Sequence, residues 1–462
     1  MNAMARNSRN RSGLASIVAI ILLAVLVALA AGLAGPSDLG LQKGRNLADA
    51  QRARLAAESG LAFIVPHLRN LALSWTTTDS TLSANVAAAL AGRLNGTANL
   101  AGQVVQRAGD TVTVPIIQTN DGAFQVLLVK SGVNTLRLEV HGWRGDLRRI
   151  VALDLYLTAA NPNSAFNYGI ASRGAIAVSG NAQIRGKNQA TDASVISTTA
   201  GPVAITIEGN TIIDGDVSSV GAATTVVISG SPTIAGSQNP VVIAQHIHFG
   251  VEAPVFPEVD TGVFRPLANG DVIDGSTDTT RHGAVFNNPT IKANTNPTFS
   301  SDVVLNGIVF VEAPNRVTFT AKVTLNGLVA TEQASSPLAD CRLSFAGQVE
   351  AFGVSALPSG PMFDQAKQMT GTFIVAPGFD VSFAGQFTAI NGTIAAEKLT
   401  FSGQASGTVN GSVIGLGNYP TAISGTVDIY IDRKNDEGDD AGFHMPVSLG
   451  IRAETYRELS GT

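Results

Sequence analysis

Charged residues, aromatic residues and cysteine are all scarce in this chain. Only 14% of its 462 residues are charged and 6% are aromatic, whereas an average soluble domain carries about 25% charged residues. The single cysteine excludes a disulfide scaffold and a cysteine-cluster metal site. A net charge of −5 gives no positive field that would attract nucleic acid. What is abundant, 48 glycines and 45% hydrophobic residues, is typical of a solenoid or an extracellular β protein.

Charge is absent altogether from one long run near the N-terminus. Residues 14–34 are apolar or small apart from Ser16, and a helix of this length crosses a hydrocarbon core. The run exceeds the ~7–15 residues of a signal-peptide core. Three arginines and no acid precede it, which favours a cytoplasmic N-terminus and an exported chain: Arg6, Arg9 and Arg11. We therefore predict a transmembrane helix over residues 14–35 that ends or kinks at Gly35-Pro36.

A second, amphipathic helix is predicted from about Leu41 to Ser74. Its apolar side chains recur at steps of three, four and three residues: Leu61, Ile64, Leu68 and Leu71. This spacing forms one apolar helix face, which we expect to pack on its own domain. Pro66 is expected to interrupt the helix.

The order of residues around these two helices matches a known pattern. A basic leader ends at Gly13, a hydrophobic helix begins at Leu14, and the run Ala57-Glu58-Ser59-Gly60 follows. Polar residues of the pattern lie between them: Asn46, Asp49, Gln51 and Arg52. Over about the first seventy residues the chain resembles PilX-like minor pilins and GspK-like pseudopilins of the type IV pilin superfamily.

The resemblance implies a processing site, partners and a location. A prepilin peptidase would cut after Gly13 and methylate Leu14. The chain would span the bacterial inner membrane once, and its helix would later leave the lipid bilayer to pack against other pilin-like subunits. Major pilins carry glutamate at the fifth mature position, where this chain has Val18. Tip subunits are similar in lacking that glutamate, which favours a minor, initiating subunit. A plain single-pass anchor without a filament is the alternative.

Short β runs separated by turn signals follow the helical segment. A helix is predicted over Leu82–Leu94, ended by Asn95-Gly96. The gaps between the runs predict an antiparallel meander with these strands: Gln103–Ala108, Thr111–Gln118, Ala123–Lys130, Leu136–Trp143 and Ile150–Thr158. A helix packed on such a meander is similar in outline to a pilin head, and a generic α+β module fits equally well.

From about Phe166 one motif repeats, a short apolar run followed by glycine. Its copies are 176–180, 205–209, 226–230, 303–307, 323–327, 343–347, 381–385 and 399–403. Most steps lie near 19 to 21 residues if the 77 residues between Gly230 and Gly307 are taken as four turns. This period predicts a solenoid, specifically a right-handed parallel β-helix, with a β-sandwich as the alternative. At ~20 residues and ~4.8 Å per coil it has roughly thirteen coils.

The predicted fold class is therefore mainly β, with an N-terminal transmembrane helix and an α+β module followed by a right-handed parallel β-helix. The predicted domains are a basic leader (1–13), the transmembrane helix (14–35), helix plus meander (36–160), the β-helix (161–431) and a C-terminal cap or tail (432–462). Because solenoid ends are open, the meander is expected to cover one end and the last thirty residues the other. Phe249–His282 and Ser335–Asp340 break the period as loops that are candidates for binding surfaces.

Paired acids are candidates for catalysis, because β-helices often carry polysaccharide lyases and hydrolases. Asp214 with Asp216, and Asp271 with Asp274, satisfy the carboxylate separation of about 5–9 Å that glycoside hydrolysis requires. Residues two apart on a strand satisfy it almost automatically, and few basic residues lie nearby to bind uronates. Catalysis is therefore not favoured.

Metal binding has two candidate segments. His246 and His248 lie on one strand face, as metal ligands do, but the only further histidine considered, His282, is distant in sequence, so exposed histidines are favoured. The acidic run Asp432–Asp440 could supply oxygens to calcium. Lys434 and Glu437 break the EF-hand order, so a solvated turn is favoured.

No residue is assigned to catalysis, a cofactor or a metal, and Cys341 is expected to be an inert buried thiol. We expect no enzyme and no nucleic-acid partner. The favoured function is a membrane-anchored minor subunit in type IV pilus or pseudopilus assembly, which exposes a β-helical rod for adhesion or subunit contacts. The alternatives are a membrane-tethered polymer-forming or adhesive β-helix and a tethered polysaccharide-degrading enzyme.

Overall fold

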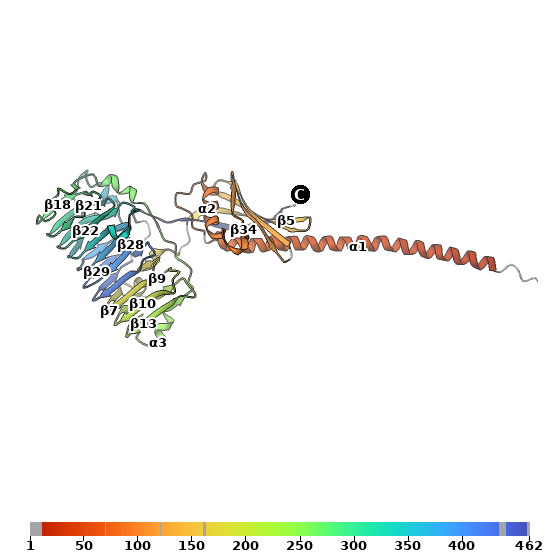
Figure 1. The fold of residues 1–462 in the computed structure, drawn as a ribbon, viewed down its shortest axis with the longest axis horizontal. Helices are drawn as coiled ribbons and strands as arrows, with labels where there is room; N and C mark the ends of the chain where they lie inside the picture. The colour runs from red at the N-terminus through yellow and green to blue at the C-terminus, as the bar shows by residue number, and fades with distance from the viewer. Residues whose placement is uncertain (1–11, 70, 121, 160–162, 434–439, 460–462) are drawn as a thin grey trace, which may run out of the picture. The chain divides into compact units, whose positions relative to one another are not determined.

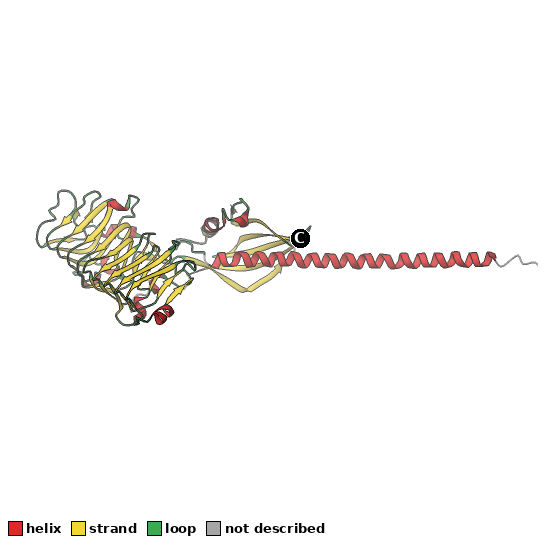
Figure 2. Ribbon diagram, turned by 60° about the horizontal axis from the view of Figure 1, so that its bottom comes forward, coloured by secondary structure: helices red, strands yellow, loops and turns green. Residues whose placement is uncertain are grey.

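The chain divides into two compact units. In the computed structural model, residues 1–158 and 447–462 form the first unit and residues 159–446 the second. Residues 1–11, 70, 121, 160–162, 434–439 and 460–462 lie outside the description (Figure 1), and only the backbone is described at positions 12–16 and 30–39. The arginines of the predicted leader therefore lie outside the described residues. Figure 2 shows a long helix in the first unit and the strand-rich second unit.

Helix α1 (Ser12–Arg69) is continuous over 58 residues. It passes through Pro36 and Pro66, so the predicted end at Gly35-Pro36 and the predicted interruption at Pro66 are wrong. Each proline costs a helix about 3 kcal/mol, which a long cooperative helix can absorb. No helix among the described residues is long and apolar enough to cross a membrane. The predicted span, residues 14–35, extends at both ends into positions whose side chains are not described.

The C-terminal part of α1 packs on a six-stranded antiparallel sheet with the strand order β1-β2-β3-β4-β5-β34. Its strands are β1 (Gln106–Ala108), β2 (Thr111–Thr119), β3 (Gly122–Gly132), β4 (Thr135–Arg144), β5 (Leu147–Ala159) and β34 (Val447–Leu459). The predicted meander is thus confirmed, as is the helix α2 (Leu82–Leu94). Ile64, Leu68 and Leu71 are buried in the core beneath the sheet, so the apolar face of α1 packs on its own unit as expected.

Two glycines allow α1 to lie close to the sheet. A methyl group at Gly142 of β4 would overlap the carbonyl oxygen of Ala53 in α1. A methyl group at Gly60 of α1 would come within 2.6 Å of Phe124 and Val140. Gly60 belongs to the run that carries the pilin resemblance, and close helix–sheet packing gives a physical reason for a small residue there.

The last strand joins the first unit. β34 lies beside β5 in the sheet. The backbone N–H of Asp154 donates to the Thr455 hydroxyl (2.8 Å), and Arg457 donates to the Asp154 carboxylate (3.1 Å). The prediction that residues 432–462 cap the β-helix is therefore wrong for the strand at its end. An amphipathic strand fits any sheet edge, and its partner is about 300 residues away in the chain.

The second unit is a parallel β-solenoid of about twelve turns, each of which passes three faces. We call the first the ladder face; in spatial order it contains β20 (Thr298–Phe299), β22 (Asn315–Phe319), β24 (Cys341–Phe345), β26 (Thr372–Phe383), β28 (Thr393–Phe401), β31 (Thr421–Gly425), β7 (Ile176–Gly180), β10 (Val203–Gly209) and β13 (Thr225–Gly230). The predicted parallel β-helix is confirmed, and its right-handed sense stays a prediction.

The other two faces are built in the same way. The covered face contains β17 (Val272–Ile273), β19 (Thr290–Ile291), β21 (Val303–Val311), β23 (Val323–Thr331), parts of β26 and β28, β30 (Val413–Gly415), β6 (Ile170–Ser172), β9 (Val195–Ser197), β12 (Val217–Ser219) and β15 (Ile247–Phe249). The third face contains β18 (Ala284–Asn287), the first parts of β21 and β23, β25 (Val349–Ala351), β27 (Ala389–Asn391), β29 (Ser406–Asn410), β32 (Asp428–Ile431), β8 (Gln183–Gly186), β11 (Ile212–Ile213) and β14 (Thr233–Ile234).

The coils of the solenoid are not stacked in chain order. β31 near the C-terminus pairs with β7 near the start, with Gly425 opposite Gly180. Figure 1 shows the result: the blue C-terminal strands lie between the teal strands and the yellow N-terminal ones. After β15 the chain returns to the opposite end and begins again at β17. The first segment of the solenoid therefore continues the stack that the last segment builds.

This return explains the irregular step in the repeat. The 77 residues between Gly230 and Gly307 are not four turns, because they contain the passage from one end to the other. Gly230 lies on the ladder face, whereas Gly307 lies in β21, opposite Gly327 of β23. Within each segment the predicted register is confirmed: Ile176 pairs with Ile205, and Leu343 with Val381.

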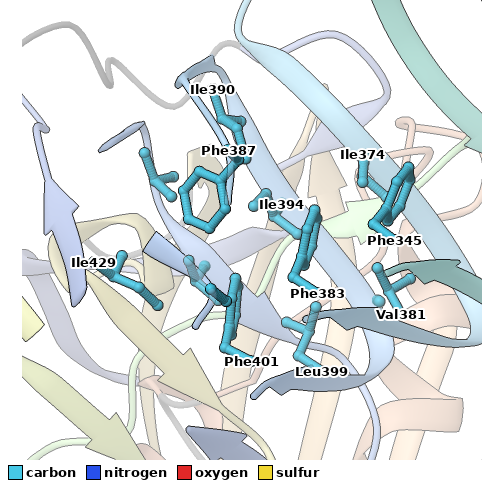
Figure 3. Packing of buried hydrophobic residues seen from close by; sticks show 14 of the residues in the cluster. Phe345, Ile374, Val381, Phe383, Phe387, Ile390, Ile394, Leu399, Phe401 and Ile429 are labelled. Carbon is cyan, nitrogen blue, oxygen red and sulfur yellow. The ribbon is translucent and has the colours of Figure 1, made fainter. Parts of the chain in front are cut away.

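Inward side chains of the ladder face form continuous rows. Five phenylalanine rings stack with centroids 4.8–5.2 Å apart and planes within 7–11° of parallel: Phe299, Phe319, Phe345, Phe383 and Phe401. Figure 3 shows three of them in line. The same row continues across the junction as Ile423 and Val178. The ring spacing matches the distance between paired strands, so the stack fixes the register of each coil.

The covered face carries a second apolar core on its outside. Outward side chains there, such as Ile308, Phe310 and Leu328, are buried. They pack against residues of the connecting segments: Phe166, Phe256, Phe264, Phe363 and Phe443. The stretch Phe249–His282, expected to be a candidate binding loop, therefore serves in part as the return connection that covers this face.

Loss of one ring from the phenylalanine stack is expected to destabilise the second unit. Phe383→Ala should lower the free energy of unfolding by about 3–5 kcal/mol, because it leaves a cavity between two stacked neighbours. Phe352, whose side chain is 46% exposed, provides the control, and Phe352→Ala should cost less than about 1 kcal/mol. Urea unfolding of both variants measures the difference, and equal losses would contradict the assigned role of the stack.

Candidate functional site

Two of the predicted candidates, Asp216 and the His246/His248 pair, come together near one end of the solenoid. Asp216 Oδ1 lies 2.7 Å from His246 Nδ1, and Asp216 Oδ2 lies 3.7 Å from His248 Nε2. The three side chains are 37–43% exposed. The cluster is thus a surface feature in which one carboxylate faces two imidazoles.

Strand register explains this cluster. β12 and β15 are parallel neighbours, with Val217 opposite Ile247, so the residues that precede these two, Asp216 and His246, share a row. His248 lies on the same side of β15 as His246 because side chains alternate along a strand. Each group was noticed separately in the sequence, and the coil spacing between them is the signal that would have joined them.

The two acids Asp214 and Asp216 do not face each other across a substrate site. Asp214 Oδ2 accepts a hydrogen bond from the backbone N–H of Gly186 (3.2 Å), in the coil on one side. Asp216 contacts His246, in the coil on the other side. Because the carboxylates engage opposite neighbours, their arrangement does not favour the facing acid pair of a glycosidase.

The other predicted acid pair has a structural role. Asp271 Oδ2 accepts from the backbone N–H of Asn287 (2.7 Å). Asp274 Oδ1 accepts from the hydroxyl and the backbone N–H of Ser276 (2.7 and 2.9 Å). These hydrogen bonds hold the pKa of Asp274 below its ordinary value. Both carboxylates therefore stabilise loops at the first coils.

Metal ligands are not gathered in the part of the chain that the structure describes. No group of three or more His, Cys, Asp or Glu side chains there could hold a metal ion. His282 precedes β18 in the first coils, whereas His246 and His248 belong to the last coil. Of the acidic run Asp432–Asp440, positions 434–439 lie outside the described residues. Asp432 accepts from the side-chain amide of Asn188 (2.7 Å) and lies 3.4 Å from Lys187 Nζ.

Cys341 is fully buried at the start of β24, as predicted. Burial raises the pKa of its thiol. The predicted loop before it, Ser335–Asp340, joins β23 to β24, and an ion pair of 2.6 Å between Arg316 and Asp340 fixes its end.

The predicted processing site lies in the first turn of α1, where only the backbone of Gly13 and Leu14 is described. Beyond it, the described side chains from Ile17 to Leu29 are all apolar and all exposed. Leu23 is 66% exposed and Ile20 63%. No charge occurs in this stretch. It is the most apolar exposed surface of α1.

Comparison with known proteins gives one likeness. No family model and no curated protein matches the chain. The crystal structure of the competence-associated pilin ComZ from Thermus thermophilus is similar to 89% of this chain and is itself covered to 97%, with 12% sequence identity and a TM-score of 0.28. Identity and TM-score at this level carry no argument about function, so the proposals below rest on the residues of this chain.

Burial of Cys341 predicts that the thiol does not react in the folded protein. Iodoacetamide should leave it unlabelled at pH 8 and label it fully in urea, because a buried thiol with a raised pKa forms little accessible thiolate. Intact-mass measurement checks both states. Rapid labelling of the folded chain would contradict the burial of β24.

Proposed function

We propose that the chain is a membrane-anchored, pilin-like minor subunit that takes part in the assembly of a type IV pilus or pseudopilus. The first part of α1 would lie in the bacterial inner membrane as a single span, with the N-terminus in the cytoplasm and the bulk of the chain periplasmic or extracellular. Other pilin-like subunits and a prepilin peptidase would be its protein partners. The β-solenoid would serve for adhesion or subunit contacts, which is a structural and not an enzymatic role.

The observation that carries the proposal is the exposed apolar stretch Ile17–Leu29. Burying a large aliphatic side chain is worth about 1.5–3 kcal/mol, and ten such side chains are exposed here: Ile17, Val18, Ile20, Ile21, Leu22, Leu23, Val25, Leu26, Val27 and Leu29. Lipid or the helices of sister subunits would remove this surface from water. Ala19, Ala24 and Ala28 between them permit the close helix contacts that association in lipid depends on.

The C-terminal part of the same helix supports a pilin-like arrangement. Here α1 is buried against an antiparallel sheet through Ile64 and Leu68, while its first part has no such cover among the described residues. One helix would then serve two environments, a globular head and an apolar phase. The absence of an acid at Val18 supports a minor, initiating subunit through the resemblance to tip subunits.

A membrane-tethered polymer-forming or adhesive β-helix is the second candidate. The observation that favours it is the end of the solenoid at β13, where Val227 and Ile228 are 40% and 37% exposed. An apolar hollow of about 390 Å³ beside them is lined by Ile228, Pro240 and Ile243. An uncharged edge strand of this kind can pair with another chain. The tethered polysaccharide-degrading enzyme has no comparable support, because Asp214 and Asp216 engage opposite coils.

Processing of the N-terminus decides between the first two candidates. Co-expression with an active prepilin peptidase should yield a mature chain that begins at a methylated Leu14, and mass spectrometry of the N-terminal peptide detects it. Gly13→Val provides the control and should keep the leader, because a bulky side chain would stand at the cleavage position. A full-length, unmethylated chain beside a processed pilin from the same cells would contradict the pilin proposal.

A further inference from the structure

The outer face of the meander carries a hollow that is lined by amide side chains. Its volume is about 570 Å³, and it lies over β1, β2 and β3 and the loop before them. Five amides line it: Asn99, Gln103, Gln106, Gln118 and Gln125. No charged residue is among its lining residues. This size is within the range of about 300–1,000 Å³ that small-molecule sites occupy.

A β-bulge forms the floor of the hollow. In the pairing of β2 with β3, Val114 lies opposite Val126 and Ile117 opposite Phe124, and the register shifts between these pairs. Pro115 and Ile116 therefore oppose the single residue Gln125. Bulges interrupt the hydrogen-bond ladder, bend the strand and re-aim side chains, often beside functional sites. Here the bulge places an apolar surface, with Ile116 44% exposed, between the amides.

The rim of the hollow is held in an unusual backbone conformation. Ala101 lines it with φ of +47° and precedes Gly102 with φ of +83°. An alanine in the left-handed region is uncommon, and such residues persist where the surrounding structure fixes them, often at ligand sites. The loop thus presents Asn99 and Gln103 to the hollow at a cost in backbone energy.

The amides have free hydrogen-bonding capacity. Among the described residues, the structure gives none of the five a side-chain hydrogen bond. Each amide offers two donor hydrogens and an acceptor oxygen. Thr113, which lies opposite Gln106 in the strand pairing, adds a hydroxyl. Donors and acceptors are therefore both present at high density, with no charge to favour an ion.

An aromatic surface continues the face next to the hollow. Across the strands, Gln125 lies opposite His141, and Ala123 lies opposite both Gln118 and Trp143. Trp143 therefore shares a row with Gln118, with only the methyl group of Ala123 between them. Burial lowers the pKa of His141, so that its ring is neutral at pH 7. His141 also contacts Trp143, with ring centroids 5.9 Å apart.

We propose that this hollow binds an uncharged oligosaccharide. Hydroxyl groups are both donors and acceptors, as the amides are, and the apolar face of a pyranose ring can pack on Ile116 or the indole of Trp143. Acidic glycans and nucleic acids are not matched, because no cation lines the hollow. The inference does not depend on the proposed pilus role, since binding is a property of the first unit alone.

Binding is tested with the full chain and defined sugars. The two tryptophans are Trp75 and Trp143, so Trp75→Phe leaves Trp143 as the only fluorescent indole. Maltohexaose, cellohexaose and chitohexaose serve as neutral probes, and a galacturonate hexamer as the charged one. We expect at least one neutral hexasaccharide to shift the Trp143 emission below about 5 mM, an affinity near −3 to −4 kcal/mol. The galacturonate hexamer should leave it unchanged.

Matched variants locate the site. In the same Trp75→Phe background, Gln125→Glu is nearly isosteric but replaces the amide donor with a negative charge, and should weaken neutral-sugar binding by about tenfold or more. Gln333→Glu changes an exposed glutamine in the second unit and should alter the affinity by less than about twofold. Thermal unfolding confirms that both variants are folded. The proposal is overturned if no neutral hexasaccharide binds, if the charged hexamer binds as tightly, or if the two variants bind alike.

Discussion

The stacking of each coil on the next, at the spacing of paired β-strands, is the constraint on which the second unit depends. A strand separation of about 4.8 Å is also the distance at which flat rings stack, and the phenylalanine row from Phe299 to Phe401 uses it at every step. Asparagines make a parallel ladder, in which Asn326 donates to Asn306 and Asn306 to Asn287. A slip of one residue would turn such rows outward, so the rows define the register.

The same constraint explains how the chain can enter its own solenoid in the middle. A coil needs a partner with matching rows, and that partner need not be its neighbour in sequence. Ile423 of the last segment continues the phenylalanine row and meets Val178 of the first. The return connection after β15 costs no apolar exposure, because Phe256 and Phe264 pack on the covered face. Since this pairing joins residues about 245 positions apart in the chain, we expect it to form late in folding.

Local patterns in the sequence predicted the elements, while long-range partners escaped them. The period of two and the turn residues located the meander, and Asn95-Gly96 located the end of α2, because these signals act over a few residues. The place of β34 and the order of the coils depend on partners hundreds of residues away. The sequence also hid both surface sites: Asp216 meets His246 only through coil stacking, and Gln106, Gln118 and Gln125 meet only through the meander. A repeat interval that fits no whole number of turns, as between Gly230 and Gly307, was the one local sign of the return.

Cross-linking across the junction tests the coil order most directly. Ser179 lies opposite Ser424, about 5 Å away at the spacing of paired strands, so the variant Ser179→Cys/Ser424→Cys should be joined rapidly by a short bis-maleimide. Ser344 is four strands from this position on the ladder face, about 19 Å at the same spacing, and Ser179→Cys/Ser344→Cys should remain unlinked. The buried Cys341 should not compete. Efficient linkage of residues 179 and 424, detected by peptide mass spectrometry, is the predicted result; no linkage there would contradict the permuted solenoid.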